Sequence, residues 1–147
     1  MIRVYLDTCC FNRPFDDQTQ LRVRLESKAI LLVLQSVARG EWALIGSDAI
    51  DAEIAAIRDP TRRRRVMELA RAATEHVGID ADRSRRQQSL EAMGFGSYDS
   101  FHIACAEAAG ADALLTTDDG LIRRARRLHH QLAVRVANPV TWLEEIE

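Results

Sequence analysis

Short apolar runs alternate with longer segments of mixed polarity along the chain. The apolar runs are too short for helices and rich in strand-favouring residues. We therefore expect strands at residues 2–6, 42–46, 112–117 and 133–137. The longer segments begin at capping residues or end at glycine or before proline, which indicates helices. The expected helices cover residues 19–38, 48–58, 61–76, 81–93, 99–110 and 120–130, and a short final helix begins at Pro139.

Strands that are separated by helices predict a parallel sheet. We therefore expect an α/β fold of three layers, α/β/α, with a central and mainly parallel sheet. The 147 residues contain no repeat or linker, so residues 1–147 are expected to form a single domain. Sites in such folds lie beyond the carboxyl ends of the strands, and this gives a positional test for any candidate residue.

Composition narrows the class of protein. Hydrophobic residues make up 47% and charged residues 29%, which is typical of a globular domain. No apolar run reaches the roughly 18 residues of a membrane span, and the start lacks a signal-peptide pattern, so we expect a cytoplasmic protein without a membrane partner. Cys9 and Cys10 are adjacent and Cys105 is distant, a spacing that fits neither a disulfide framework nor a zinc site.

The charge distribution is more informative than the net charge of −2. Lys28 is the only lysine, so nearly all basic residues are arginine, whose planar guanidinium suits phosphate recognition. For each cluster, a solvated helix face is the competing interpretation. The arginines gather at Arg62–Arg65, at Arg83, Arg85 and Arg86, and at Arg123, Arg124, Arg126 and Arg127.

Acidic residues fall where a parallel sheet would place a site. Asp7 follows the first expected strand and Asp118 follows the third. Asp99 begins a helix, and Glu53 lies in the helix after the second strand. Taken singly, each aspartate could also be an ordinary turn or helix-capping residue.

Glu53 and Asp99 are harder to explain as surface residues. Glu53 borders the apolar stripe that Ile50, Ile54 and Ile57 form, whereas surface glutamates usually lie opposite such a stripe. Asp99 begins a helix that is apolar nearly all round and shares a face with His102. A carboxylate that points inward needs a partner for its charge.

Convergence of these carboxylates would require protonation, pairing with arginine or a cation. Two like charges about 4 Å apart repel by about 4 kcal/mol at an effective dielectric of about 20. Oxygen ligands without a Cys/His set favour Mg²⁺ or Mn²⁺ over zinc. Such ions commonly act on phosphate oxygens, so the predicted chemistry is phosphodiester hydrolysis.

Four motifs together resemble the PIN-domain nucleases, a family that includes the VapC-like toxin ribonucleases of toxin–antitoxin pairs. The resemblance covers the whole chain, and the motifs occur in the family's order. They are residues 4–8 at the first strand, residues 47–54 after the second, Asp99 to Ala106 as a D-x-x-H-x-A helix, and residues 114–119 as a strand that ends in T-x-D.

The resemblance implies Mg²⁺- or Mn²⁺-dependent cleavage of single-stranded RNA, with Asp7, Glu53, Asp99 and Asp118 as the metal ligands. It further implies a hydrogen bond from Thr117 within the site and an outer-shell role for Asp119, whereas His102 is expected to be a buried core histidine. A toxin role implies a separate antitoxin protein as partner, and the apolar helices suggest a homodimer. The chain departs from the family at Cys9, where relatives often carry a small polar residue, and at residues 11–17, which are longer than in typical toxins.

Other classes fit less well. A haloacid-dehalogenase-type phosphotransferase needs a second aspartate where Cys9 stands, and a response-regulator receiver needs a lysine after its last strand. No G-x-x-x-x-G-K phosphate loop is present, and neither Cys9 nor Cys10 has a nearby histidine in sequence to activate it as a nucleophile. A non-catalytic PIN-fold module that binds RNA or dimerises remains the alternative. Mn²⁺ should stabilise the nuclease and not the module.

Overall fold

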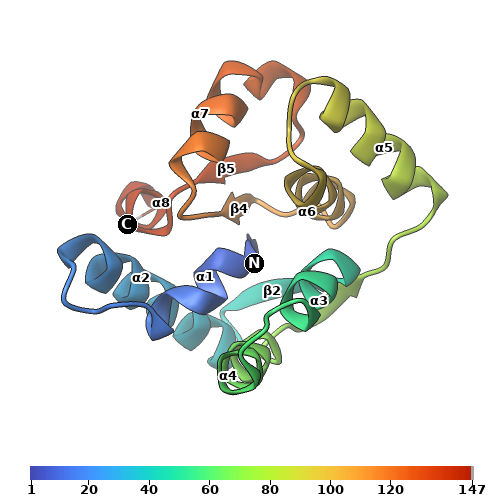
Figure 1. Ribbon diagram of the computed structural model, residues 1–147. Helices are drawn as coiled ribbons and strands as arrows, with labels where there is room; N and C mark the ends of the chain where they lie inside the picture. The colour runs from blue at the N-terminus through green and yellow to red at the C-terminus, as the bar shows by residue number, and fades with distance from the viewer. Residues whose placement is uncertain (147) are drawn as a thin grey trace.

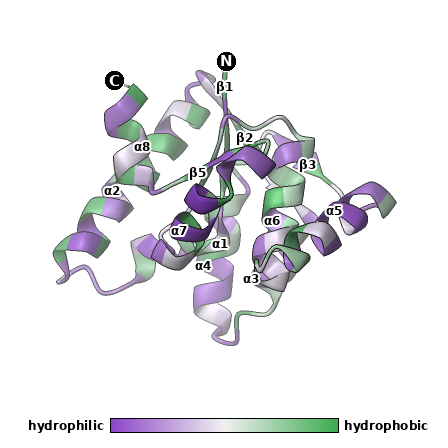
Figure 2. Cartoon of the chain, turned by 90° about the horizontal axis from the view of Figure 1, so that it is seen from above, coloured by the Kyte–Doolittle hydropathy of each residue, from purple (hydrophilic) through white to green (hydrophobic). Residues whose placement is uncertain are grey.

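The computed structural model describes residues 1–146, which form an α/β fold around a five-stranded parallel sheet in the order β3-β2-β1-β4-β5 (Figure 1). The strands are β1 (Ile2–Leu6), β2 (Trp42–Ser47), β3 (Glu75–Val77), β4 (Ala113–Leu115) and β5 (Arg135–Ala137). The α-helices are α1 (Thr8–Asn12), α2 (Leu21–Ala38), α3 (Asp48–Ala55), α4 (Pro60–Ala70), α5 (Ala81–Ala92), α6 (Ser97–Ala108), α7 (Asp119–Arg127) and α8 (Pro139–Ile146), with short 3-10 turns η1 (Arg13–Phe15) and η2 (His129–Gln131). Helices α2 and α8 pack together on one side of the sheet, and α5 and α6 on the other (Figure 2). The predicted three-layer fold with a parallel sheet is therefore confirmed.

The first strand is the centre of the sheet. It pairs with β2 from Ile2 to Tyr5 and with β4 from Val4 to Leu6. Val4, Tyr5 and Leu6 are fully buried, as expected for a parallel strand covered on both faces. The amide of Asp7 continues the pairing by donating to the carbonyl oxygen of Leu115 at 2.9 Å. Asp7 is therefore fixed at the carboxyl end of the central strand.

Two elements differ from the expectation. The helix expected over residues 61–76 ends at Ala70, and Glu75–Val77 forms the edge strand β3 instead. This strand is short, pairs only with β2 and is largely exposed, so it lacks the apolar run that marks the other strands. The second difference is α1, which turns the chain directly after Asp7 and was not expected.

No helix among residues 1–146 combines the length and the apolar character that a bilayer crossing requires.

A buried carboxylate ties α2 to three other parts of the fold. Glu26 is only 2% exposed and forms ion pairs with Arg13 at 3.0 Å and Arg22 at 3.1 Å. The side-chain amide of Asn138, at the junction of β5 and α8, donates to Glu26 at 2.6 Å. Arg22 in turn donates to the carbonyl oxygen of Thr117 at 3.0 Å, in the loop after β4. Glu26 therefore links α2 to η1, to α8 and to the loop that carries Asp118.

We expect Glu26→Gln to lower the free energy of unfolding by roughly 1–3 kcal/mol, because it removes the charge that satisfies a buried hydrogen-bond network. Urea unfolding with Glu41→Gln as the matched control measures this, since Glu41 is exposed. Equal midpoints for the two variants would show that the network adds nothing to stability.

Candidate metal centre

The four predicted carboxylates lie at the carboxyl edge of the sheet. Asp7 follows β1 and precedes α1, and Asp118 caps α7 after β4. Glu53 lies in α3 and Asp99 in the first turn of α6. Because β1, β2 and β4 are parallel neighbours, the segments that leave their carboxyl ends meet at one edge.

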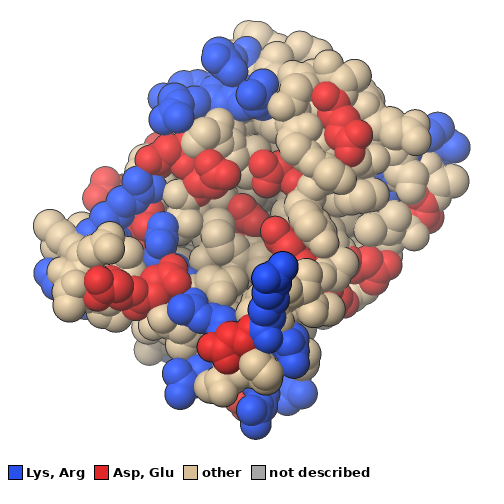
Figure 3. Space-filling model, viewed as in Figure 1, with Lys and Arg blue, Asp and Glu red and all other residues tan. Residues whose placement is uncertain are grey.

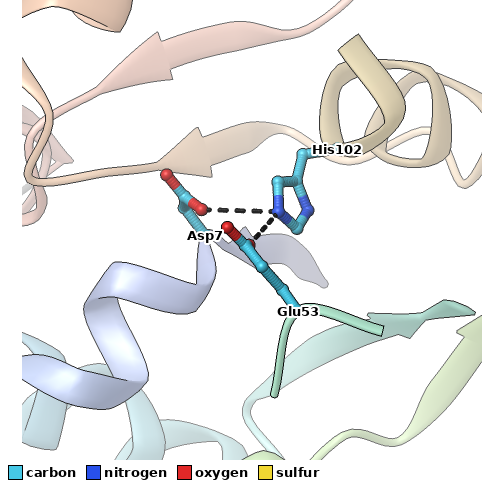
Figure 4. Close-up of side chains that lie close together, drawn as sticks. All are labelled: Asp7, Glu53 and His102. Atoms are coloured by element: carbon cyan, nitrogen blue, oxygen red, sulfur yellow. Dashed lines mark hydrogen bonds and ion pairs between the residues drawn. The ribbon is translucent and has the colours of Figure 1, made fainter. Parts of the chain in front are cut away.

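Asp7, Glu53 and His102 form the tightest group at this edge (Figure 4). Their ligand atoms all lie within 4.8 Å of one another. The Nε2 atom of His102 is 2.7 Å from Glu53 Oε1 and 3.5 Å from Asp7 Oδ1. His102 is fully buried, as predicted, but it also contacts two of the candidate ligands, a role that the sequence did not indicate.

A relay of hydrogen bonds holds His102 and therefore Glu53. The Tyr5 hydroxyl lies 2.6 Å from His102 Nδ1 and 2.6 Å from the Ser47 hydroxyl. Ser47 also accepts from the amide of Ile50 at the start of α3. A neutral imidazole satisfies the relay: Ser47 donates to Tyr5, Tyr5 donates to Nδ1, and Nε2–H donates to Glu53. Tyr5 and Ser47 were not predicted as site residues, because nothing in the sequence distinguishes them from core and capping residues.

The charge state of His102 reflects its neighbours. Burial favours the neutral ring, but the hydrogen bond to Glu53 and the charges of Asp7, Glu53 and Asp99 together raise the pKa of His102. For Glu53, burial opposes ionisation, yet the hydrogen bond with His102 leaves the pKa of that carboxyl below its usual value. Since Nε2 is engaged with Glu53, the ring orients a ligand and has no nitrogen free for a metal.

Thr116 fixes the other oxygen of Asp7. Its hydroxyl donates to Asp7 Oδ2 at 2.8 Å and accepts from the amide of Asp118 at 3.1 Å. Thr116, the threonine of the T-x-D motif, thus makes the contact that was expected of Thr117. Thr117 contributes its backbone, with the amide 3.4 Å from Cys9 Sγ. The Cys9 thiol lies 3.4 Å from Asp7 Oδ2, so it stands in for the small polar residue expected there.

Asp118 serves as both helix cap and candidate ligand. Its Oδ1 atom accepts from the amides of Gly120 at 2.9 Å and Leu121 at 3.2 Å. Within residues 1–146, Oδ2 has no hydrogen-bond partner and remains available to a cation. The capping interpretation of Asp118 is therefore correct and compatible with a metal-binding role.

Asp99 does not cap its helix, because Gly96 occupies that position. Burial raises the pKa of Asp99 to about 6, with further increases from the charges of Asp7, Asp118 and Glu53 and an opposing effect of His102. The same charges that raise this pKa would be neutralised by a cation.

Asp119 lies outside the cluster. It forms a bidentate ion pair with Arg22, with distances of 2.7 and 2.8 Å, which lowers the pKa of the carboxyl. The pair anchors α7 to α2, which gives Asp119 a structural contact that the sequence did not indicate.

The donor set fits a hard cation. Asp7, Glu53, Asp99 and Asp118 offer carboxylate oxygens, and the Nε2 atom of His102 is engaged with Glu53. Oxygen donors of this kind suit Mg²⁺ or Mn²⁺. Figure 3 shows a hollow at the centre of the face, where acidic side chains gather.

A pocket of about 350 Å³ opens beside Glu53. It is lined by residues of α1 and η1, by Glu53 and Ile57, and by Thr117. A larger groove of about 750 Å³ lies between α2, α7, β5 and α8, and none of the four carboxylates lines it. Of these two, only the smaller pocket is lined by one of the four carboxylates, Glu53.

A parallel α/β sheet with a carboxylate cluster at its carboxyl edge defines the class of this protein. The PIN domain family matches residues 4–127, and the chain therefore belongs to the PIN domain family. No curated protein matches the chain in sequence.

Two solved structures share the fold. One is VapBC2 from Rickettsia felis bound to a DNA fragment from their promoter, with 14% identity, a TM-score of 0.61 and coverage of 93% of this chain and 98% of that chain. The other is VapBC-1 from nontypeable Haemophilus influenzae, with 13% identity, a TM-score of 0.54 and coverage of 95% of this chain and 98% of that chain.

Protonation of Asp99 should make the stability of the metal-free protein depend on pH. Its pKa of about 6 in the folded protein exceeds the ordinary value of 3.8, so the folded state holds this proton more tightly than the unfolded state. The resulting stabilisation is fully present below pH 3.8 and is lost as pH rises through about 6. We expect Asp99→Asn to stabilise the protein in EDTA by roughly 1–2 kcal/mol at about pH 7.5 and by much less at about pH 4.5. Urea unfolding at both pH values measures this, and a pH dependence identical to wild type would contradict it.

Proposed function

We propose that the protein is a Mg²⁺- or Mn²⁺-dependent endoribonuclease that hydrolyses phosphodiester bonds of single-stranded RNA. The observation that supports this most is the placement of Asp7, Glu53, Asp99 and Asp118 at one sheet edge, where hydrogen bonds from Thr116 and His102 orient Asp7 and Glu53. Membership of the PIN domain family supports the same activity.

Asp7, Glu53, Asp99 and Asp118 would hold the ion. When bound, the ion lowers the pKa of a coordinated water and neutralises charge on the scissile phosphate. Thr116 keeps Asp7 in one rotamer, and His102 does the same for Glu53. The two capping bonds to Oδ1 of Asp118 hold its other oxygen toward the site. These contacts fix the ligand oxygens before substrate arrives, which is the preorganisation that catalysis requires.

Arg13 is the basic residue in the lining of the smaller pocket. It lines the 350 Å³ pocket together with Asn12 and Thr8, next to Glu53. Its ion pairs with Glu26 and with Asp16, the latter at 3.1 Å, hold the guanidinium at the pocket wall. We propose that this pocket receives the part of the RNA adjoining the cleaved bond.

We expect wild-type protein to cleave a labelled single-stranded RNA in Mn²⁺ or Mg²⁺ and to be inactive in EDTA. Asp7→Asn should lose more than the ~100-fold typical of outer-shell changes, because it removes a ligand. Asp51→Asn is the matched control, since Asp51 is an exposed carboxylate of the same sheet edge that pairs with His76 at 3.1 Å. Full activity of Asp7→Asn would overturn the site assignment.

Thermal unfolding separates the nuclease from the non-catalytic module. Mn²⁺ should raise the melting temperature of wild type and of Asp51→Asn, and have a much smaller effect on Asp7→Asn. In EDTA, Asp7→Asn should be at least as stable as wild type, because it relieves like-charge repulsion. A wild-type protein that neither cleaves RNA nor gains stability from Mn²⁺ would favour the module.

We also propose a separate antitoxin as protein partner, which the VapBC neighbours support. The groove between α2 and α8 is the surface suited to it, because Leu21 and Leu25 line it and are 60% and 46% exposed. The isolated chain is proposed to form a homodimer. A light-scattering mass equal to that of one chain would contradict the dimer.

A further inference from the structure

The structure separates the arginine clusters by their partners. On α5, Arg83 pairs with Asp80, Arg85 with Asp82 and Arg86 with Glu107. These guanidinium groups are already neutralised within the chain.

On α4, Arg62 donates to Asp16 at 2.9 Å and to the carbonyl oxygens of Asn12 and Phe15. Arg63 donates to the carbonyl oxygen of Ile57 at 2.7 Å. Arg62 therefore holds the α1–η1 segment in place, and its loss would disturb the pocket as well as any RNA contact.

The α7 cluster differs from the other two in the pairing of its side chains. Across residues 1–146, the side chains of Arg123, Arg124, Arg126 and Arg127 have neither an ion-pair nor a hydrogen-bond partner. Arg123 and Arg127 are exposed and lie four residues apart, so they share one face of the helix with Asp119. The charge of Asp119 at the start of this face is already matched by Arg22.

This face begins at the metal centre. Asp118 is the N-cap of α7, so Arg123 lies about 7 Å and Arg127 about 13 Å farther along the helix axis. Figure 3 shows the positive patch over α7 directly beside the acidic hollow. An anionic chain with one phosphate at the metal centre would meet these guanidinium groups as it leaves along α7.

Helix stability explains the α7 arginines only in part. Cations in the last turn favour the helix dipole, which accounts for Arg126 and Arg127. Arg123 lies four residues after Asp119, a favourable pair whose acidic member is already bound by Arg22. Arg123 also lies four residues before Arg127, and such a like-charge pair destabilises a helix by about 0.2–0.5 kcal/mol.

We propose that the exposed face of α7, with Arg123 and Arg127 at its centre, binds the phosphates of single-stranded RNA on one side of the scissile bond. This inference rests on the proposed function, and it identifies the α7 cluster rather than Arg62–Arg65 as the main phosphate-binding surface. Arg123 and Arg127 act in positioning the substrate and take no part in the chemical step.

The test compares Arg123→Gln/Arg127→Gln with Arg39→Gln/Arg71→Gln. The control removes the same charge from exposed residues that precede β2 and β3, at the opposite edge of the sheet. Fluorescence anisotropy with a short labelled single-stranded RNA in EDTA gives binding without cleavage. Steady-state cleavage in Mn²⁺ gives KM and kcat.

We expect the α7 double variant to bind roughly tenfold more weakly than the control, and the slope of log affinity against log salt to fall by about 1.4, or ~0.7 for each lost phosphate contact. KM should rise while kcat stays within twofold, and the melting temperature should stay level or rise. A purely structural role would lower the melting temperature and kcat together.

Equal binding and equal KM in the two double variants would overturn the inference while leaving the nuclease intact. Binding without Mn²⁺-dependent cleavage by wild type would overturn the proposed function, and the anisotropy comparison would still decide the role of α7. Wild-type protein that neither binds nor cleaves RNA would overturn both.

Discussion

Concentrated negative charge at the carboxyl edge of the sheet is the constraint on which the rest of the structure depends. Burial and three neighbouring carboxylates raise the pKa of Asp99 to about 6. Asp7 is only 6% exposed, so water screens its charge poorly. Hydrogen bonds from the Thr116 hydroxyl and the His102 ring hold Asp7 and Glu53 in place. A bound cation would neutralise the remaining negative charge. Two arginines fix the segments around this edge. Arg22 donates a hydrogen bond to the loop beside Asp118, and Arg62 donates one to the segment that lines the pocket.

The sequence predicted the fold and the candidate ligands because both depend on local signals. Apolar runs marked four of the five strands. The three aspartates followed a strand or lay near the start of a helix, and Glu53 bordered the apolar stripe of its own helix. The edge strand β3 was missed because its exposed residues carry no burial pattern. Tyr5 and Ser47 were missed for the opposite reason, since their roles depend on which residues face them across the fold. A buried tyrosine in a central strand resembles any core residue until His102 is placed beside it.

The arginine clusters also depend on contacts between residues that are distant in the sequence. The sequence indicated three comparable clusters, and only the folded chain shows which of them have acidic partners. Arg86 meets Glu107 across 21 residues and Arg62 meets Asp16 across 46, distances at which sequence reasoning has no information. Arg22 and Asp119 are 97 residues apart, and their ion pair redefines Asp119 as an anchor. The sequence showed only that arginines gather in clusters. The ion pairs of the folded chain show which of these clusters keep unpaired charges.

The hydrogen bond between Thr116 and Asp7 spans 109 residues, and β1 joins β4 to make it. During synthesis the amino-terminal ligands emerge first and remain without their partners until the segment with Thr116 and Asp118 has left the ribosome. A chain that is still being made, or one cut short before β4, carries Asp7, Glu53 and Asp99 but no assembled centre. Under the proposed function, hydrolysis could begin only after the segment with Thr116 and Asp118, and therefore most of the chain, has been translated.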